Sequence, residues 1–114
     1  MLTLEALRAY GADVDTGLSR CMGMKDFYLR LVNTELGDKN FDLLKSAVEE
    51  GNPKAAFEAA HALKGALNNL SLTPLAQPVA ELTDLLRHKD AMPDTGELLP
   101  RILQALSDLK ALAK

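Results

Sequence analysis

The sequence is short of several residue types, and each shortage narrows what the protein can be. Its single cysteine, Cys21, has no second cysteine for an internal disulfide or a zinc site. We expect Cys21 to be a small buried residue. Tryptophan is absent, aromatic residues make up 4% of the 114 residues, and β-branched residues are sparse. Leucine and alanine dominate instead, which favours an all-α core of aliphatic side chains.

Long apolar runs and an excess of positive charge are also missing. No stretch approaches the ~20 apolar residues that cross a bilayer. The N-terminal segment carries Glu5 and Arg8, which a signal peptide would not place among its apolar residues. The net charge is -3 at pH 7, whereas nucleic-acid-binding domains usually carry a basic stripe. We therefore expect a soluble cytoplasmic protein that binds neither nucleic acid nor a membrane.

Glycine, proline and aspartate divide the first half of the chain into helical segments. A short helix is expected to end at Gly11, and a second to be capped by Asp13 or Asp15. The segment 24–50 is predicted as one long helix or as a pair interrupted at Gly37-Asp38. Its apolar stripe is predicted to consist of Phe27, Leu31, Val32, Phe41, Leu44 and Val48.

The second half is predicted to contain three helices, at 53–70, 75–88 and 97–113. The first follows a turn in which Gly51 ends one helix, Asn52 caps the next and Pro53 begins it. Thr73 is predicted to cap the second helix, with Pro74 at its first position. Long helices with short connections predict an antiparallel up-and-down four-helix bundle with short N-terminal helices. We expect one domain, 1–114, and a monomer.

The stretch FEAAHALKGALNNLS, 57–71, places a histidine within an otherwise ordinary amphipathic helix. A helix turns ~100° per residue, so the apolar side chains fall about 180–260° away from His61. These side chains are Ala56, Ala60, Leu63, Leu67 and Leu70. His61 therefore faces away from the core. His88, the second histidine, lies beside two basic residues near a predicted helix C-terminus and is interpreted as solvated.

The neighbours of His61 distinguish it from an ordinary surface histidine. Lys64, Gly65, Asn68 and Phe57 all lie within ~60° of it around the helix. Glycine costs roughly 1 kcal/mol relative to alanine in an exposed helix, and is useful where another molecule must approach the backbone. A neutral imidazole is a good nucleophile, and a lysine can balance the charge of phosphate oxygens. The pattern predicts a docking site for phosphoryl transfer, in which Phe57 exposes an aromatic ring.

This segment resembles the signature of histidine-containing phosphotransfer (HPt) domains, roughly A-H-x-L-K-G-[AS]-x-x-x-[LI]-G. Residues 60–61, 63–66 and 70 match as they stand, whereas Ser71 replaces the usual glycine at the end of the helix. We expect Ser71 to alter the turn rather than the chemistry. Upstream, GADVDTGLSRCMGMKDFYLRLV resembles the N-terminal segment of the family. The resemblance thus covers most of the chain.

The resemblance implies a relay of phosphoryl groups between receiver domains of response regulators in His–Asp signalling, with no autonomous kinase activity. It makes His61 the phosphoacceptor, Lys64 the residue that stabilises phosphoryl oxygens, and Gly65 the residue that admits the partner. Asn68 is a looser match. The expected partners are response-regulator receiver domains or a hybrid sensor histidine kinase. The partner would supply Mg²⁺, so no cofactor or metal ligand is expected on this chain.

Other functions are less consistent with the sequence. A helical adaptor that binds a receiver without accepting phosphate would share the docking face, but would not need His61, Lys64 and Gly65 intact. The dimerisation domain of a sensor kinase places an acidic residue directly after its histidine, where this chain has Ala62. A hydrolase would need a nucleophile–base pair, a glycine-rich phosphate loop or a metal signature, and none is present.

Overall fold

The computed structural model describes residues 1–114 and is all-α, as the composition predicts. No strand is present. None of the helices combines the length and the apolar character that crossing a membrane requires. The helices are α1 (Leu4–Tyr10), α2 (Val14–Arg20), α3 (Lys25–Leu36), α4 (Asn40–Glu49), α5 (Pro53–Asn69), α6 (Thr73–Leu86) and α7 (Leu98–Leu112).

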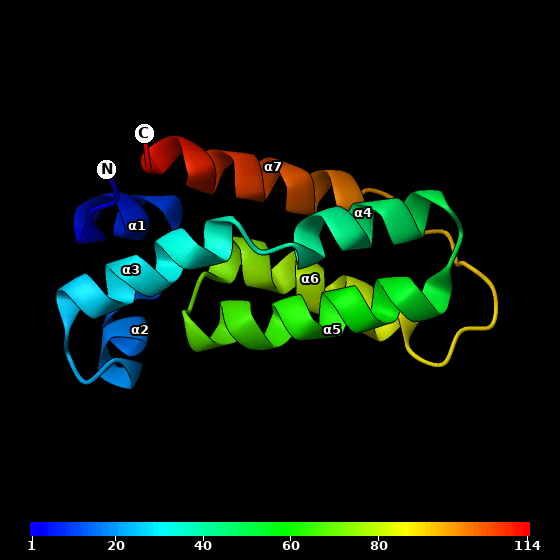
Figure 1. Cartoon of the computed structure of the whole chain (residues 1–114), viewed down its shortest axis with the longest axis horizontal. Helices are drawn as coiled ribbons and strands as arrows, with labels where there is room; N and C mark the ends of the chain where they lie inside the picture. Colours follow the sequence, from blue (N-terminus) through cyan, green and yellow to red (C-terminus); the bar gives the residue numbers. More distant parts are fainter.

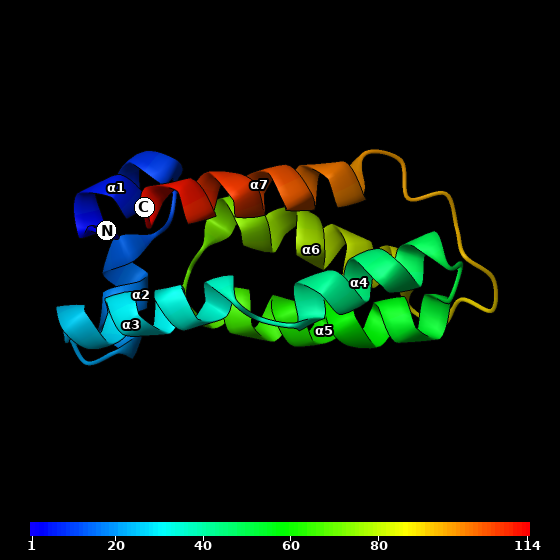
Figure 2. The ribbon, with the colours of Figure 1, turned by 45° about the horizontal axis from the view of Figure 1, so that its top comes forward.

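The four C-terminal helices lie side by side, and consecutive helices pack against each other (Figures 1 and 2). The helices α3 and α4 follow one another along the long axis of the molecule. The two short helices α1 and α2 lie at the end where α3 begins, and α1 also contacts α7. The chain ends meet there, since the Met1 amino group donates a hydrogen bond of 2.6 Å to the Lys114 carbonyl oxygen.

Local sequence signals explain where the first helices begin and end. The backbone of Gly11 adopts a φ of 112°, a left-handed conformation that ends α1 and that other residues adopt with difficulty. Asp13, and not Asp15, caps α2 by accepting a hydrogen bond of 3.2 Å from the Thr16 amide. Asp15 instead forms an ion pair of 2.8 Å with Arg8.

The segment 24–50 is two helices rather than one. Gly37 follows the last residue of α3, and Asp38 accepts a hydrogen bond of 2.9 Å from the Asn40 amide at the start of α4. Glu35 lies beside this break, where one of its carboxyl oxygens is buried without a hydrogen-bond partner. Burial and the neighbouring Asp38 raise the pKa of Glu35 to about 8. The break therefore contains a carboxyl group that is most stable when protonated.

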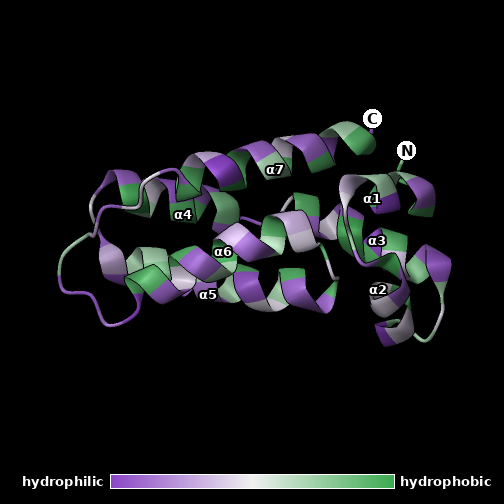
Figure 3. Ribbon diagram, turned by 180° about the vertical axis from the view of Figure 1, so that it is seen from behind, coloured by the Kyte–Doolittle hydropathy of each residue, from purple (hydrophilic) through white to green (hydrophobic).

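The core is mostly aliphatic, with Tyr28 and Phe41 as its aromatic members, and it is continuous through all seven helices. Every helix is amphipathic, with apolar and polar residues alternating along the ribbon in Figure 3. Cys21 is buried, with 5% of its surface exposed, as predicted. The largest fully buried side chains are Tyr28, Leu7, Leu44, Leu63, Leu67, Leu72, Leu75, Leu82, Leu86, Ile102, Leu109 and Val14.

Several predictions about individual residues are wrong. The apolar stripe is predicted to include Phe27, but Phe27 is 41% exposed and its neighbour Tyr28 is fully buried in its place. The Tyr28 hydroxyl donates a hydrogen bond of 2.8 Å to the Leu70 carbonyl oxygen. Thr73 does not cap α6, because Leu72 occupies the cap position and Thr73 is the first helical residue. The helix also ends at Leu86, so His88 lies beyond it.

Candidate functional site

The site is built on α5, the longest helix, whose start follows the predicted pattern. The Asn52 side chain caps the helix by accepting a hydrogen bond of 3.1 Å from the Ala55 amide, and Pro53 is the first helical residue. The residues predicted to face the core are all buried: Ala56, Ala60, Leu63, Leu67 and Leu70. His61, Gly65 and Asn68 are exposed along the other side of the helix. Packing of the apolar face thus fixes the direction in which His61 points.

His61 stacks on Phe57, one turn earlier on α5. The two ring centroids are 5.6 Å apart and the ring planes differ by 12°. Neither ring nitrogen of His61 forms a hydrogen bond within the chain. Because the lone pair of an unprotonated imidazole nitrogen lies in the ring plane, stacking leaves that nitrogen free to react. His61 is thus an exposed imidazole that is held on one of its ring faces.

Phe57 is half-buried, contrary to the expectation of an exposed ring. Its side chain packs against the hydrophobic core, and the guanidinium carbon of Arg87 lies 5.2 Å from its ring centroid. Contact between a cation and the face of an aromatic ring is favourable. The helical wheel places Phe57 on the same side as His61, but it does not reveal that the two rings stack or that Arg87 covers Phe57.

Lys64 and Gly65 provide a cation and open space next to His61. Lys64 is half-buried and takes part in none of the three salt bridges of the chain. Gly65 lies within α5, and a Cβ added to it would meet no atom within 4 Å. Neither a close neighbour nor a left-handed backbone therefore requires glycine at this position. The fold would accept a side chain at Gly65.

Asn68 lies near the end of α5, where an arginine that the sequence did not single out approaches the helix. The Arg20 guanidinium donates a hydrogen bond to the Asn68 carbonyl oxygen and lies 3.5 Å from the Ser71 hydroxyl oxygen. Arg20 comes from α2, so only the tertiary structure brings it to this place. Its contact leaves the Asn68 side chain exposed on the His61 side of the helix.

Ser71 occupies the turn between α5 and α6 and is 8% exposed. Its φ is 57°, in the left-handed region where glycine is favoured and other residues are strained. Its carbonyl oxygen accepts a hydrogen bond of 2.9 Å from the Asp13 amide. The departure from the HPt signature therefore falls on a backbone conformation that suits glycine.

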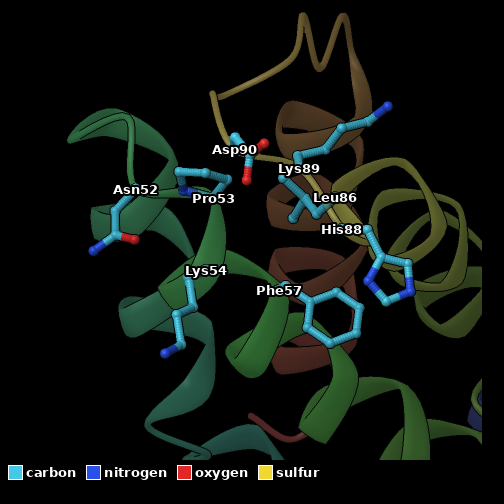
Figure 4. A pocket seen from close by; sticks show the side chains of 8 residues that line it. All are labelled: Asn52, Pro53, Lys54, Phe57, Leu86, His88, Lys89 and Asp90. Carbon is cyan, nitrogen blue, oxygen red and sulfur yellow. The ribbon is translucent and has the colours of Figure 1, made fainter.

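A cleft of about 570 Å³ opens beside Phe57, between the start of α5 and the segment after α6. Figure 4 shows its lining, in which Phe57 and His88 belong to the same cleft. His88 is exposed and has a φ of 58° just beyond α6. The lining residues are Asn52, Pro53, Lys54, Phe57, Leu86, His88, Lys89 and Asp90. The structure contains no group of three or more His, Cys, Asp or Glu side chains that could hold a metal ion.

Comparison with known protein families places this chain in one of them. A protein-family model described as the Hpt domain matches residues 34–112, which is more than half of the chain. Searches of curated proteins and of solved structures found no match. The matched segment includes all of α4, α5, α6 and α7, and so the helix that carries His61, Lys64 and Gly65. The chain belongs to the Hpt domain family.

Proposed function

We propose that this protein is a phosphotransfer intermediate in a multistep His–Asp phosphorelay, in which His61 accepts a phosphoryl group from a receiver domain and passes it on. The observation that carries the proposal is the setting of His61. Its ring is exposed, its nitrogens form no hydrogen bond within the chain, and Gly65 leaves open space beside it. Family membership implies phosphorelay chemistry, and this setting supports an active acceptor rather than a non-catalytic adaptor.

The transfer step uses few groups of this chain. The lone pair of the unprotonated ring nitrogen forms the new N–P bond, while the P–O bond to the receiver's aspartate breaks and its electrons remain on the carboxylate. The proton on the other ring nitrogen is then released to water. Positioning and electrostatics supply most of the catalysis in such a loose transition state. The ammonium of Lys64, unpaired with any carboxylate, would stabilise the phosphoryl oxygens.

The proposal also assigns the partner and its metal. The receiver domain of a response regulator, or of a hybrid sensor histidine kinase, would bring its own Mg²⁺ to His61. Gly65 would admit the receiver, and Asn68 and Phe57 would lie within the contact area. The chain would have no kinase activity of its own. We further propose that residues 1–114 form one domain, with α3–α4, α5, α6 and α7 as an antiparallel up-and-down bundle and α1 and α2 at one end.

A phosphotransfer assay tests the proposal. The purified protein is incubated with a phosphorylated receiver domain and Mg²⁺, and acid-labile phosphate on the protein is measured over time. We expect wild-type protein to become labelled and His61→Gln to remain unlabelled. His88→Gln is the matched control, because this histidine is also exposed but lies beyond α6.

Three outcomes separate the alternatives. If wild type and His88→Gln become labelled and His61→Gln does not, His61 is supported as the acceptor. Labelling of His61→Gln at the wild-type rate would place the acceptor elsewhere. Failure of wild type to become labelled while it binds the receiver with measurable affinity would favour the non-catalytic adaptor.

A further inference from the structure

The stack between Phe57 and His61 connects an exposed ring to the hydrophobic core. Phe57 packs against the core and lines the cleft together with Leu86. Arg87 lies over the same aromatic ring. These contacts restrict the rotation of the Phe57 side chain, and His61 lies nearly parallel to it with an interplanar angle of 12°. The plane of the imidazole is thus set by a ring that is itself held in place.

The orientation of the imidazole needs a cause, because the χ2 torsion of an exposed histidine adopts a broad range of angles. In metal sites and catalytic triads, the ring of a functional histidine is usually oriented by a hydrogen bond that its second nitrogen makes. No such bond forms within this chain. The stack on Phe57 is therefore the contact that defines the ring plane. It does so through the ring face and leaves free the in-plane lone pair of the unprotonated nitrogen.

We propose that Phe57 is a positioning residue that acts through His61, rather than mainly a docking residue for the partner. This role rests on the proposed function, since it concerns the same transfer step. In-line attack requires the nitrogen lone pair to point at the phosphorus atom, and an oriented nucleophile reacts faster than one that rotates freely. Loss of the stack would slow the step after the receiver has bound. Loss of a docking contact would instead weaken binding.

Three substitutions separate these roles. Phe57→Leu keeps an apolar side chain against the core but removes the stack. Phe57→Tyr keeps the ring and should restore the wild-type behaviour. Phe27→Leu is the matched control, because Phe27 is an aromatic residue on α3 that is 41% exposed and forms no aromatic pair with His61. A thermal melt of each variant establishes that it is folded at the assay temperature.

Two measurements are made on each protein. Proton NMR of His61 reports the stack directly, because the Phe57 ring current shifts the imidazole protons upfield, whether or not phosphate is transferred. Rapid-quench transfer at increasing concentrations of phosphorylated receiver gives a maximal rate and a half-saturating concentration. For Phe57→Leu we expect loss of the upfield shift and an about 2- to 10-fold lower maximal rate, with little change in half-saturation.

Each outcome has a definite meaning. Recovery of both the shift and the rate in Phe57→Tyr, together with wild-type values for Phe27→Leu, supports the positioning role. A variant that loses the shift but transfers at the wild-type maximal rate would overturn it, as would a change confined to half-saturation. If wild-type protein takes up no phosphoryl group, the proposed function fails and the positioning role fails with it. If wild-type protein does take up the phosphoryl group and Phe57→Leu transfers it at the wild-type maximal rate, only the positioning role fails.

Discussion

Replacing Gly65 by alanine should make the protein more stable and, at the same time, a poorer phosphoacceptor. Glycine within a helix is about 0.5–1 kcal/mol less favourable than alanine. Gly65→Ala should gain this full amount in its free energy of unfolding, because an added Cβ meets no atom within 4 Å and the backbone is helical. Unfolding entropies of roughly 2.1 cal/mol/K per residue convert this gain, for 114 residues, into a rise in Tm of about 2–4 °C.

The transfer rate should move in the opposite direction. Gly65 is one turn from His61 on the same side of α5, so a side chain there would lie where we propose that the receiver approaches. We expect a modest loss of rate for Gly65→Ala and a loss of at least about tenfold for Gly65→Leu, equivalent to ~1.4 kcal/mol. Thermal unfolding and rapid-quench transfer from a phosphorylated receiver measure the two effects on the same samples.

The two readouts can refute different parts of the reasoning. A lower Tm for Gly65→Ala would mean that the fold, and not a partner, requires the glycine. Unchanged transfer rates for both variants would remove the access role. Ala111→Leu is the matched control, because it adds a similar side chain to an exposed position of α7 and should leave transfer unchanged.

Two further predictions concern stability. Ser71→Gly should raise the free energy of unfolding, measured by urea denaturation, by about 0.5–1 kcal/mol, because relief of the left-handed strain exceeds the added entropy of the unfolded chain. A loss of stability would show that the contact between the Ser71 hydroxyl and Arg20 outweighs the strain. Wild-type stability should fall as the pH rises from 4.5, the ordinary pKa of Glu35, to its raised value of about 8, since the folded state holds a proton there that the unfolded state releases. Urea denaturation across this pH range should show a smaller decline in stability for Glu35→Gln. An equal decline in the two proteins would contradict the raised pKa of Glu35.

Sequence reasoning was most successful where one local signal decides the structure. The cap at Asn52, the proline after it and the three- and four-residue spacing of Leu63, Leu67 and Leu70 are enough to define α5 and its buried face. The outward direction of His61 follows from that face. The position of Gly65 on the same side follows too. These residues could be assigned because a helix fixes the angular relation between them.

Other features depend on contacts that a helical wheel does not contain. Phe27 and Tyr28 are adjacent aromatics that differ by only ~100° around α3, so the wheel could not tell which one is buried. Tyr28 is buried because its hydroxyl reaches a partner at Leu70. The half-buried state of Phe57 depends on a side-chain rotamer and on Arg87, which is far away in the sequence. The break after Gly37 was undecidable because a helix tolerates a single glycine.

The hydrogen bonds at the end of α5 determine which truncations of this protein remove contacts to that helix. Three carbonyl oxygens there, of Asn68, Leu70 and Ser71, are bonded by donors from Arg20, Tyr28 and Asp13. All three donors precede residue 34, where the family match begins. A fragment trimmed to residues 34–112 would keep α5 and His61 but would lose the hydrogen bonds that these three donors make to the end of the helix. We therefore expect a fragment of residues 34–112 to be less stable at the end of α5 than the whole chain.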